Sequence, residues 1–146
     1  MLACTFFGHR DCYGLTMEKL HSAIEALIGQ GIEEFYVGNQ GQFDSMVYHC
    51  LKQLSSMYPH IRIAVVLAYL PTEKRENEDH THTVYPEGME NVPRKFAIDR
   101  RNGWMLSHAD YVICYITHSW GGAYKFCRLA KKQGKHVVNL GDPEMQ

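Results

Sequence analysis

The sequence lacks the features of a membrane protein or a general polyanion binder. It has no uninterrupted apolar stretch near the roughly 20 residues that a transmembrane helix requires. Neither sign of charge dominates, because 15 basic and 16 acidic residues leave a formal net charge of −1. A chain without a basic excess or a polybasic stretch is not expected to bind nucleic acid or a membrane surface. An anionic ligand therefore needs a local site.

Paired cysteine motifs are also missing. The five cysteines are an odd number at irregular spacings, with no C-x-x-C motif. This pattern predicts reduced, buried thiols rather than a disulfide framework or a zinc site. His80 and His82 lie close together, but no neighbouring cysteine or further histidine completes a metal site, so we expect no metal and no cofactor. Charged residues occur by position 10, which argues against a secretory signal and favours a cytoplasmic protein.

What the sequence does contain is an alternation of short apolar runs and helical periods. This alternation predicts one α/β domain over residues 1–146, with a parallel sheet buried on both faces. Strands are expected at residues 3–7, 33–37, 61–70, 111–116 and 136–140, with helices at about residues 20–29, 43–54, 96–107 and 121–133. With right-handed crossovers, the expected fold is a Rossmann-like three-layer sandwich whose five-stranded parallel sheet has the order 3-2-1-4-5.

Such a sheet binds ligands beyond the carboxyl ends of its strands, where the strand order reverses. The loops expected at this edge read "GHRDCYG", "GNQGQFD" and "THSWGGA", and each carries glycine close to a helix start. Glycine allows backbone amides to approach a ligand, and the amino end of a helix attracts phosphate. Three such loops at one edge predict a nucleotide or phosphosugar site, although tight turns alone also require glycine.

Arg101 is the most informative single residue. In a helical projection it lies between Ala97, Ile98, Trp104 and Met105, in the middle of an apolar stripe. It either covers apolar surface with its stem or reaches an anion from the amino end of its helix. We favour contact with an anion, and Arg100, which projects further toward solvent, is the lesser candidate.

Four other residues have two interpretations each. Arg10 either contacts the ligand or lies in solvent, and His9 either contacts the ligand or caps a helix. Asp44 either caps its helix or accepts a ribose hydroxyl. Trp120 either stacks on a base or is buried. The position of its loop favours ligand contact for Arg10, and capping is the commoner role of an aspartate such as Asp44, although both roles can hold together. For His9 and Trp120 the sequence does not separate the alternatives.

Together, the segments "FFGHR", "YVGNQGQFD" and "RRNGWMLSHADYVICYITHSWGGAYKF" resemble the SLOG superfamily of Rossmann-like nucleotide-binding proteins. The resemblance spans about residues 3–140 and is strongest to small, stand-alone bacterial and phage members. The superfamily includes the "lonely guy" phosphoribohydrolases, which cut the base from nucleoside monophosphates. It also includes sensor domains that bind ADP-ribose-derived signals, and its members often form dimers. The resemblance therefore implies nucleotide binding and a homodimer or higher homo-oligomer.

The sequence departs from the hydrolases at their catalytic motif. The arginine of their Arg-Lys pair falls on Arg101, but its lysine falls on Asn102. Their P-G-G-x-G-T-x-x-E motif becomes Ser119, Trp120, Gly121 and Gly122, and its glutamate falls on residues 123–125, where no carboxylate occurs. Cleavage of an N-glycosidic bond needs a carboxylate. Asp11 or Asp44 is the available substitute.

These observations predict a module that binds a nucleoside phosphate or an ADP-ribose-type signal as a sensor or sequestering protein. The alternative is a phosphoribohydrolase-like enzyme, and no catalytic residue is assigned. The expected ligand-binding residues are Gly8, His9, Arg10, Gly38, Asn39, Gly41, Asp44, Arg101, Thr117, Ser119, Trp120, Gly121 and Gly122. The polar segment at residues 71–95 is expected to be a mobile lid or a partner surface, because connections of this length are rare unless they are functional.

Overall fold

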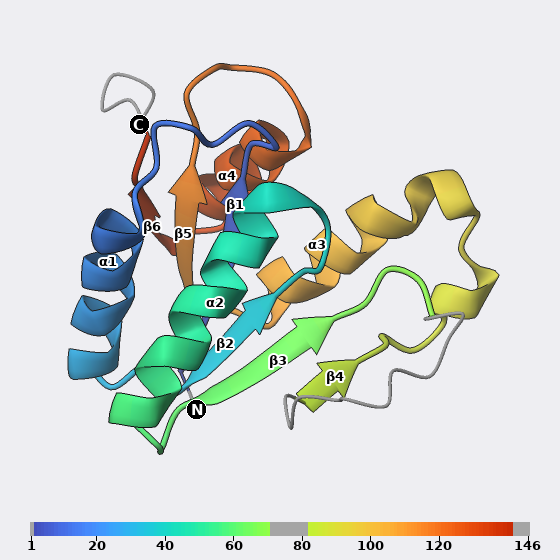
Figure 1. Ribbon diagram of the computed structural model, residues 1–146. Coiled ribbons are helices and arrows are strands. Elements are labelled where there is room, and N and C mark those ends of the chain that lie inside the picture. Colours follow the sequence, from blue (N-terminus) through green and yellow to red (C-terminus); the bar gives the residue numbers. More distant parts are fainter. Residues whose placement is uncertain (1, 71–81, 142–146) are drawn as a thin grey trace.

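A six-stranded, all-parallel sheet forms the centre of the protein (Figure 1). The computed structural model describes residues 2–70 and 82–141. The strand order is β4-β3-β2-β1-β5-β6. The strands are β1 (Ala3–Gly8), β2 (Glu34–Val37), β3 (Arg62–Val66), β4 (His82–Val84), β5 (Tyr111–Tyr115) and β6 (His136–Asn139).

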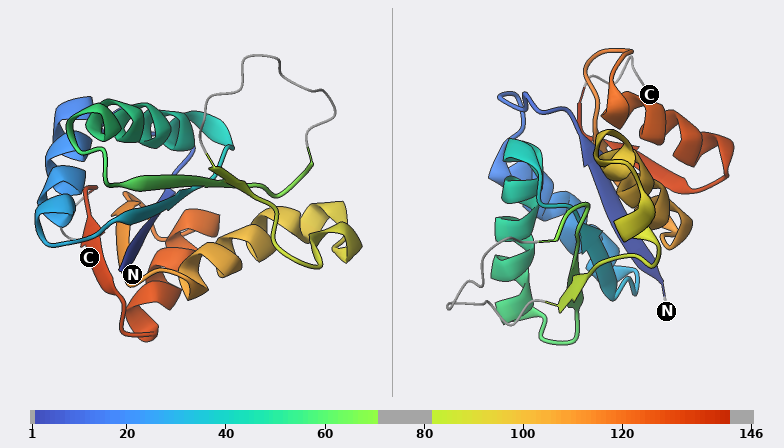
Figure 2. Two further views of the ribbon diagram at one scale, coloured as in Figure 1. Left: turned by 90° about the horizontal axis from the view of Figure 1, so that it is seen from below. Right: turned by 90° about the vertical axis from the view of Figure 1, so that its right-hand side faces the viewer.

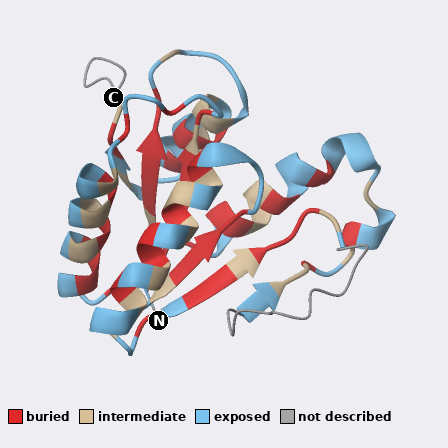
Figure 3. Cartoon of the chain, viewed as in Figure 1, coloured by how far each residue is buried: buried red, intermediate tan, exposed pale blue. Residues whose placement is uncertain are grey.

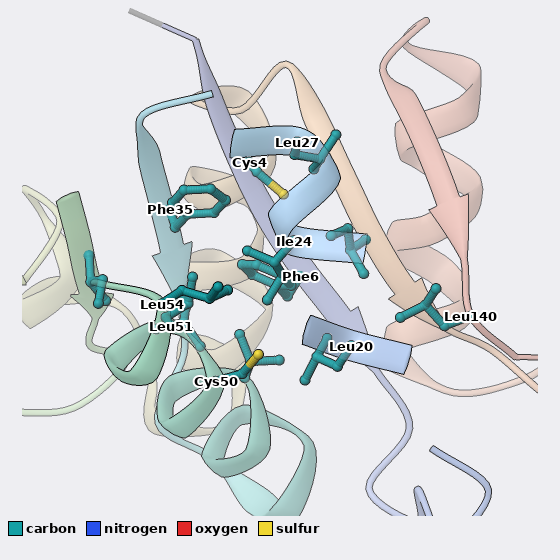
Figure 4. Close-up of a cluster of buried hydrophobic side chains, with 14 of the residues drawn as sticks. Cys4, Phe6, Leu20, Ile24, Leu27, Phe35, Cys50, Leu51, Leu54 and Leu140 are labelled. Atoms are coloured by element: carbon teal, nitrogen blue, oxygen red, sulfur yellow. The ribbon is translucent and has the colours of Figure 1, made fainter. Parts of the chain in front are cut away.

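Helices cover both faces of the sheet, as the sequence predicts (Figure 2). One face carries α1 (Met17–Gly29) and α2 (Gly41–Met57), and the other carries α3 (Ala97–Ser107) and α4 (Gly122–Lys132). Successive side chains of a strand point to opposite faces, so each strand contributes to two cores. In β1, Cys4 and Phe6 pack with α1 and α2 (Figure 4), whereas Ala3 and Phe7 pack on the side of α3 and α4.

The predicted strand order is confirmed for five strands, but the predicted total of five is wrong. The strand that the sequence does not predict is β4, which pairs with β3 at the edge of the sheet. It has only three residues, and His82 and Thr83 are exposed, so it lacks the apolar pattern that identifies the inner strands. Its formation depends on the free edge of β3, to which its backbone bonds, and this is a tertiary effect.

The segment at residues 71–95 is only partly described. Residues 71–81, including His80, lie outside the described residues, so the lid hypothesis is a prediction for that part. Residues 82–95 contain β4, the 3-10 helix η1 (Met89–Asn91) and the first residues of the 3-10 helix η2 (Arg94–Phe96). Met89 is buried with Ala68 and Ala97 in a small apolar cluster. The described part therefore contains short elements held by the buried Met89, although most of its residues are exposed.

The carboxyl ends of β1, β2 and β5 lead into loops on one side of the molecule, and most residues of these loops are exposed (Figure 3). The loops connect β1 to α1, β2 to α2 and β5 to α4. All five cysteines are buried and free. Within the two described ranges, no helix has the length and apolar character needed to cross a membrane.

Candidate ligand site at the carboxyl edge of the sheet

The predicted site loops meet where the strand order reverses. β1 lies between β2 and β5, and the chain proceeds from β1 toward one edge of the sheet and later from β5 toward the other. In the parallel register, Gly8 at the end of β1 is opposite Tyr115 at the end of β5. The residues after these two positions therefore emerge side by side, and they form one of two clusters at this edge. The other cluster lies at the ends of β2 and β3.

The first cluster joins Arg101, Asp44 and Gly38. Arg101 projects from α3 on one face of the sheet, and Asp44 lies in the first turn of α2 on the other face. The sheet no longer separates the two layers beyond the ends of β2 and β3. Arg101 is 3% exposed and donates hydrogen bonds to the Val66 carbonyl (3.1 Å) and to Asn102 Oδ1 (2.9 Å). The guanidinium is thus anchored at the carboxyl end of β3.

Gly38 permits this arrangement because it has no side chain. A Cβ atom on Gly38 would lie 2.5 Å from Arg101 Nη1 and 2.6 Å from Asp44 Oδ2, closer than real Cβ atoms approach. The glycine that the sequence assigns to ligand contact therefore has a packing role. It lets a cation from one layer and a carboxylate from the other approach the same point.

Both charged groups of this cluster are destabilised by burial. Burial raises the pKa of Asp44, while a hydrogen bond from the Gln40 amide (2.9 Å) and the nearby Arg101 charge oppose the rise. Burial lowers the pKa of Arg101, and the Asp44 charge opposes that change. An arginine still remains protonated in this setting. Asp44 thus caps the start of α2, which is one of its two predicted roles.

The second cluster is a stack of three aromatic rings. The rings of His9 and His118 are parallel within 16°, with centroids 3.5 Å apart. The rings of His118 and Trp120 are also parallel within 16°, with centroids 3.7 Å apart. His9 is 5% exposed and Trp120 is 69% exposed, so the stack runs from the interior to the surface. Of the two interpretations of Trp120, burial is wrong, because the residue is exposed.

His9 is held at the inner end of this stack. Its amide donates to the Tyr115 carbonyl (3.1 Å), and its Nε2 accepts from the His118 amide at a longer 3.4 Å. Burial, followed by the proximity of His118, lowers the pKa of His9. A lowered pKa favours the neutral imidazole at neutral pH. The ring therefore acts as an uncharged partner in the stack.

Two helix starts face the same edge. The first residue of α2, Gly41, has φ +89°, and the residue before α4, Gly121, has φ +94°, a backbone conformation that favours glycine. Neither helix has a side-chain hydrogen bond from its N-cap residue. The first turn of α4 also carries no acidic residue, unlike that of α2 with Asp44. The positive partial charge at the amino end of α4 is thus less neutralised by nearby acidic side chains than that of α2.

The other predicted residues have weaker structural support. Gly8 contacts the ring of the buried Phe43 so closely that any side chain there would collide with it, which is again a packing role. Arg10 is exposed at this edge. Four more predicted residues lie in the same loops and are exposed or lack a distinguishing contact: Asn39, Thr117, Ser119 and Gly122.

Sequence reasoning missed two residues at this edge. His118, the middle ring of the stack, lies between two predicted residues in the loop after β5. The parallel register of β1 and β5, which places that loop beside His9, is the signal that identifies it. Asn139, at the end of β6, bonds the Ile116 amide (2.9 Å), the Ile116 carbonyl (3.2 Å) and the Gly141 amide (2.9 Å). No local pattern marks this buried asparagine.

Two surface hollows of about 310 and 470 Å3 lie away from this edge. The smaller is between α3 and the segment around η1, and the larger is at the amino ends of β2 and β3, near Glu34 and Arg62. Within residues 2–70 and 82–141, no group of three or more histidine, cysteine or acidic side chains is placed to hold a metal ion.

The arrangement can therefore offer an anion a buried guanidinium and helix amides, and can offer a flat ring the indole of Trp120. It presents a half-buried carboxylate, Asp44, beside the cation. A comparison of the chain with protein-family models finds no match, and neither does a comparison with curated proteins. What the structure establishes about class is the fold: this chain is a Rossmann-like, all-parallel α/β protein.

Proposed function

We propose that this chain binds a nucleotide-derived ligand at the carboxyl edge of its sheet, as a sensor or sequestering module. The ligand class is a nucleoside phosphate or an ADP-ribose-type signal. The resemblance of three loop segments to the SLOG superfamily supports this class, and the Rossmann-like topology agrees with it. The family assignment is part of the proposal.

Arg101 is the observation that carries the proposal. A buried arginine is costly unless its donors and charge are satisfied. Among the described residues, the guanidinium donates two hydrogen bonds out of the five it can make, and Asp44, whose charge acts on it, forms no ion pair with it. A phosphate at the start of α2 would satisfy the remaining donors and the charge together.

A second candidate function is hydrolysis of the N-glycosidic bond of a nucleoside monophosphate. The observation that favours it is the raised pKa of Asp44 beside a cation, which is typical of catalytic acids. Against it, Asp44 already accepts the Gln40 amide, and no carboxylate lies in the loop where the resembling hydrolases carry theirs. Asp11, the other substitute, is exposed.

One experiment separates the two functions. We expect AMP or ADP-ribose at 100 times its dissociation constant to add about 2.7 kcal/mol of stability. For a domain of this size, that raises Tm by about 5–10 °C. We also expect chromatography of the same mixtures to show no free base. Steady release of base that disappears in Asp44→Asn would make the chain an enzyme, and the absence of any thermal shift across the panel would contradict both functions.

A further inference from the structure

The three-ring stack has an open outer end. Its inner ring, His9, is buried, and its middle ring, His118, is covered on both faces by the other two. One face of the Trp120 ring packs against His118, and Trp120 is still 69% exposed. That exposure therefore lies on the opposite face and the edges of the indole. Large aromatic side chains are usually mostly buried, so an exposed indole held in a fixed plane by other rings is unusual.

Ring packing, rather than hydrogen bonding, holds this stack together. Nδ1 of His118 is shielded from solvent and has no hydrogen-bond partner among the described residues. The bond between His118 and His9 is long, at 3.4 Å. Flat contact between rings fixes the plane of the indole, so a further ring added to its outer face meets a surface that is already oriented. Preorganisation of this kind reduces the entropy lost on binding.

The neighbourhood of Trp120 favours a ligand that joins a flat ring to an anion. Trp120 is two residues before Gly122, the first residue of α4, so the Cα atom of Trp120 lies within about 7 Å of the first Cα atom of that helix. This end has neither a side-chain cap nor an acidic residue in its first turn. A free sugar phosphate would use the amides but not the indole, and a free base would use only the indole. A nucleotide would use both.

We propose that the outer face of Trp120 is a base-stacking platform, on which the base of the bound nucleotide becomes the fourth ring after His9, His118 and Trp120. This inference rests on the proposed function, because it assigns one part of the same ligand. It goes further in placing the base on the loop after β5. A purine is the preferred base, since stacking strengthens with the area of overlapping rings.

Titration calorimetry with AMP and with ribose 5-phosphate tests the platform. We expect Trp120→Ala to weaken AMP binding about 5- to 150-fold, which corresponds to the 1–3 kcal/mol typical of one base stacked on an aromatic side chain. Trp120→Phe should retain part of the affinity. Binding of ribose 5-phosphate should be unchanged in both variants, because it has no base to stack.

Tryptophan fluorescence locates the contact directly. The chain has two tryptophans, so Trp104→Phe leaves Trp120 as the only reporter, and Trp120→Phe leaves Trp104. Trp104 packs against Tyr36 and His108, away from the ring stack, which makes it the matched control. We expect AMP to quench the emission of Trp104→Phe and not that of Trp120→Phe. Ribose 5-phosphate should quench neither.

The outcomes separate this inference from the function on which it rests. If Trp120→Ala binds AMP and ribose 5-phosphate as tightly as the native chain does, the platform is wrong and nucleotide binding stands. If the native chain binds neither compound, the proposed function fails and the platform with it. If Trp120→Ala keeps its AMP affinity but converts a native dimer to a monomer in ultracentrifugation, the indole serves an interface and the platform is overturned.

Discussion

Arg101→Met is expected to lower the free energy of unfolding by about 2–4 kcal/mol, the range for leaving buried polar and charged groups without their partner. Methionine fills much of the same volume but cannot donate to the Val66 carbonyl or to Asn102. It also leaves the half-buried Asp44 carboxylate without the positive charge that favours its ionised form. Urea unfolding of the two proteins measures the difference.

Arg100→Met is the matched control for this change. Arg100 lies next along the same helix but is exposed, so its loss should alter stability by no more than about 0.5 kcal/mol. The double variant Arg101→Met with Asp44→Asn should be less destabilised than the sum of the single changes, because the second change removes the carboxylate that the first one strands. If Arg101→Met is as stable as the Arg100 control, the buried guanidinium does not support the fold.

The same position is expected to control affinity. At a temperature where it remains folded, Arg101→Met should bind AMP about 10- to 150-fold more weakly, as expected for loss of a charge-assisted contact worth about 1.5–3 kcal/mol. Arg101→Lys should recover only part of this, since an ammonium group lacks the planar fork of guanidinium. Calorimetry gives both values. Full affinity in Arg101→Met would remove the phosphate role.

Asn139→Ala is expected to lower the free energy of unfolding by about 2–4 kcal/mol. Asn139 is 6% exposed, and its side chain bonds both the amide and the carbonyl of the buried Ile116. Alanine leaves these two backbone groups without a partner in a place that water does not reach. Because Ile116 leads into the loop with His118 and Trp120, AMP binding should weaken as well.

Asn91→Ala provides the comparison, because Asn91 is an exposed asparagine in η1, and its loss should change stability by less than about 0.5 kcal/mol. Chemical denaturation monitored by circular dichroism measures both variants. Equal stability of the two would show that the hydrogen bonds of Asn139 do not fasten the ends of β5 and β6 together.

The layers and the order of the inner strands could be predicted because burial on both faces leaves a direct mark on the sequence. β1 and β5 are continuous apolar runs, and the stripe of Leu20, Ile24 and Leu27 marks α1. β4 could not be predicted in the same way. Its residues are exposed or half-buried, and its pairing depends on the edge of β3, which exists only after the sheet has formed.

At the candidate site, the sequence indicated the loops but not the roles of the residues. The sequence predicts that Gly8 and Gly38 contact a ligand; the structure shows that they also make room for Phe43 and for Arg101 with Asp44. A glycine required for close packing and one required for close ligand approach look the same in a sequence. The ring stack was hidden for a related reason, because His9 and His118 are 109 residues apart and only the register of β1 against β5 brings them together.

Mapping of amide chemical shifts in 15N NMR spectra during an AMP titration tests whether a nucleotide binds at the carboxyl edge of the sheet. We expect saturable shifts at residues 38–43 and 118–122, the starts of α2 and α4 and the loops before them. We expect little change around Glu34, Lys52 and Arg62, which line the larger hollow at the amino edge. Shifts centred on that hollow, or no saturable shift at all, would contradict nucleotide binding at the carboxyl edge.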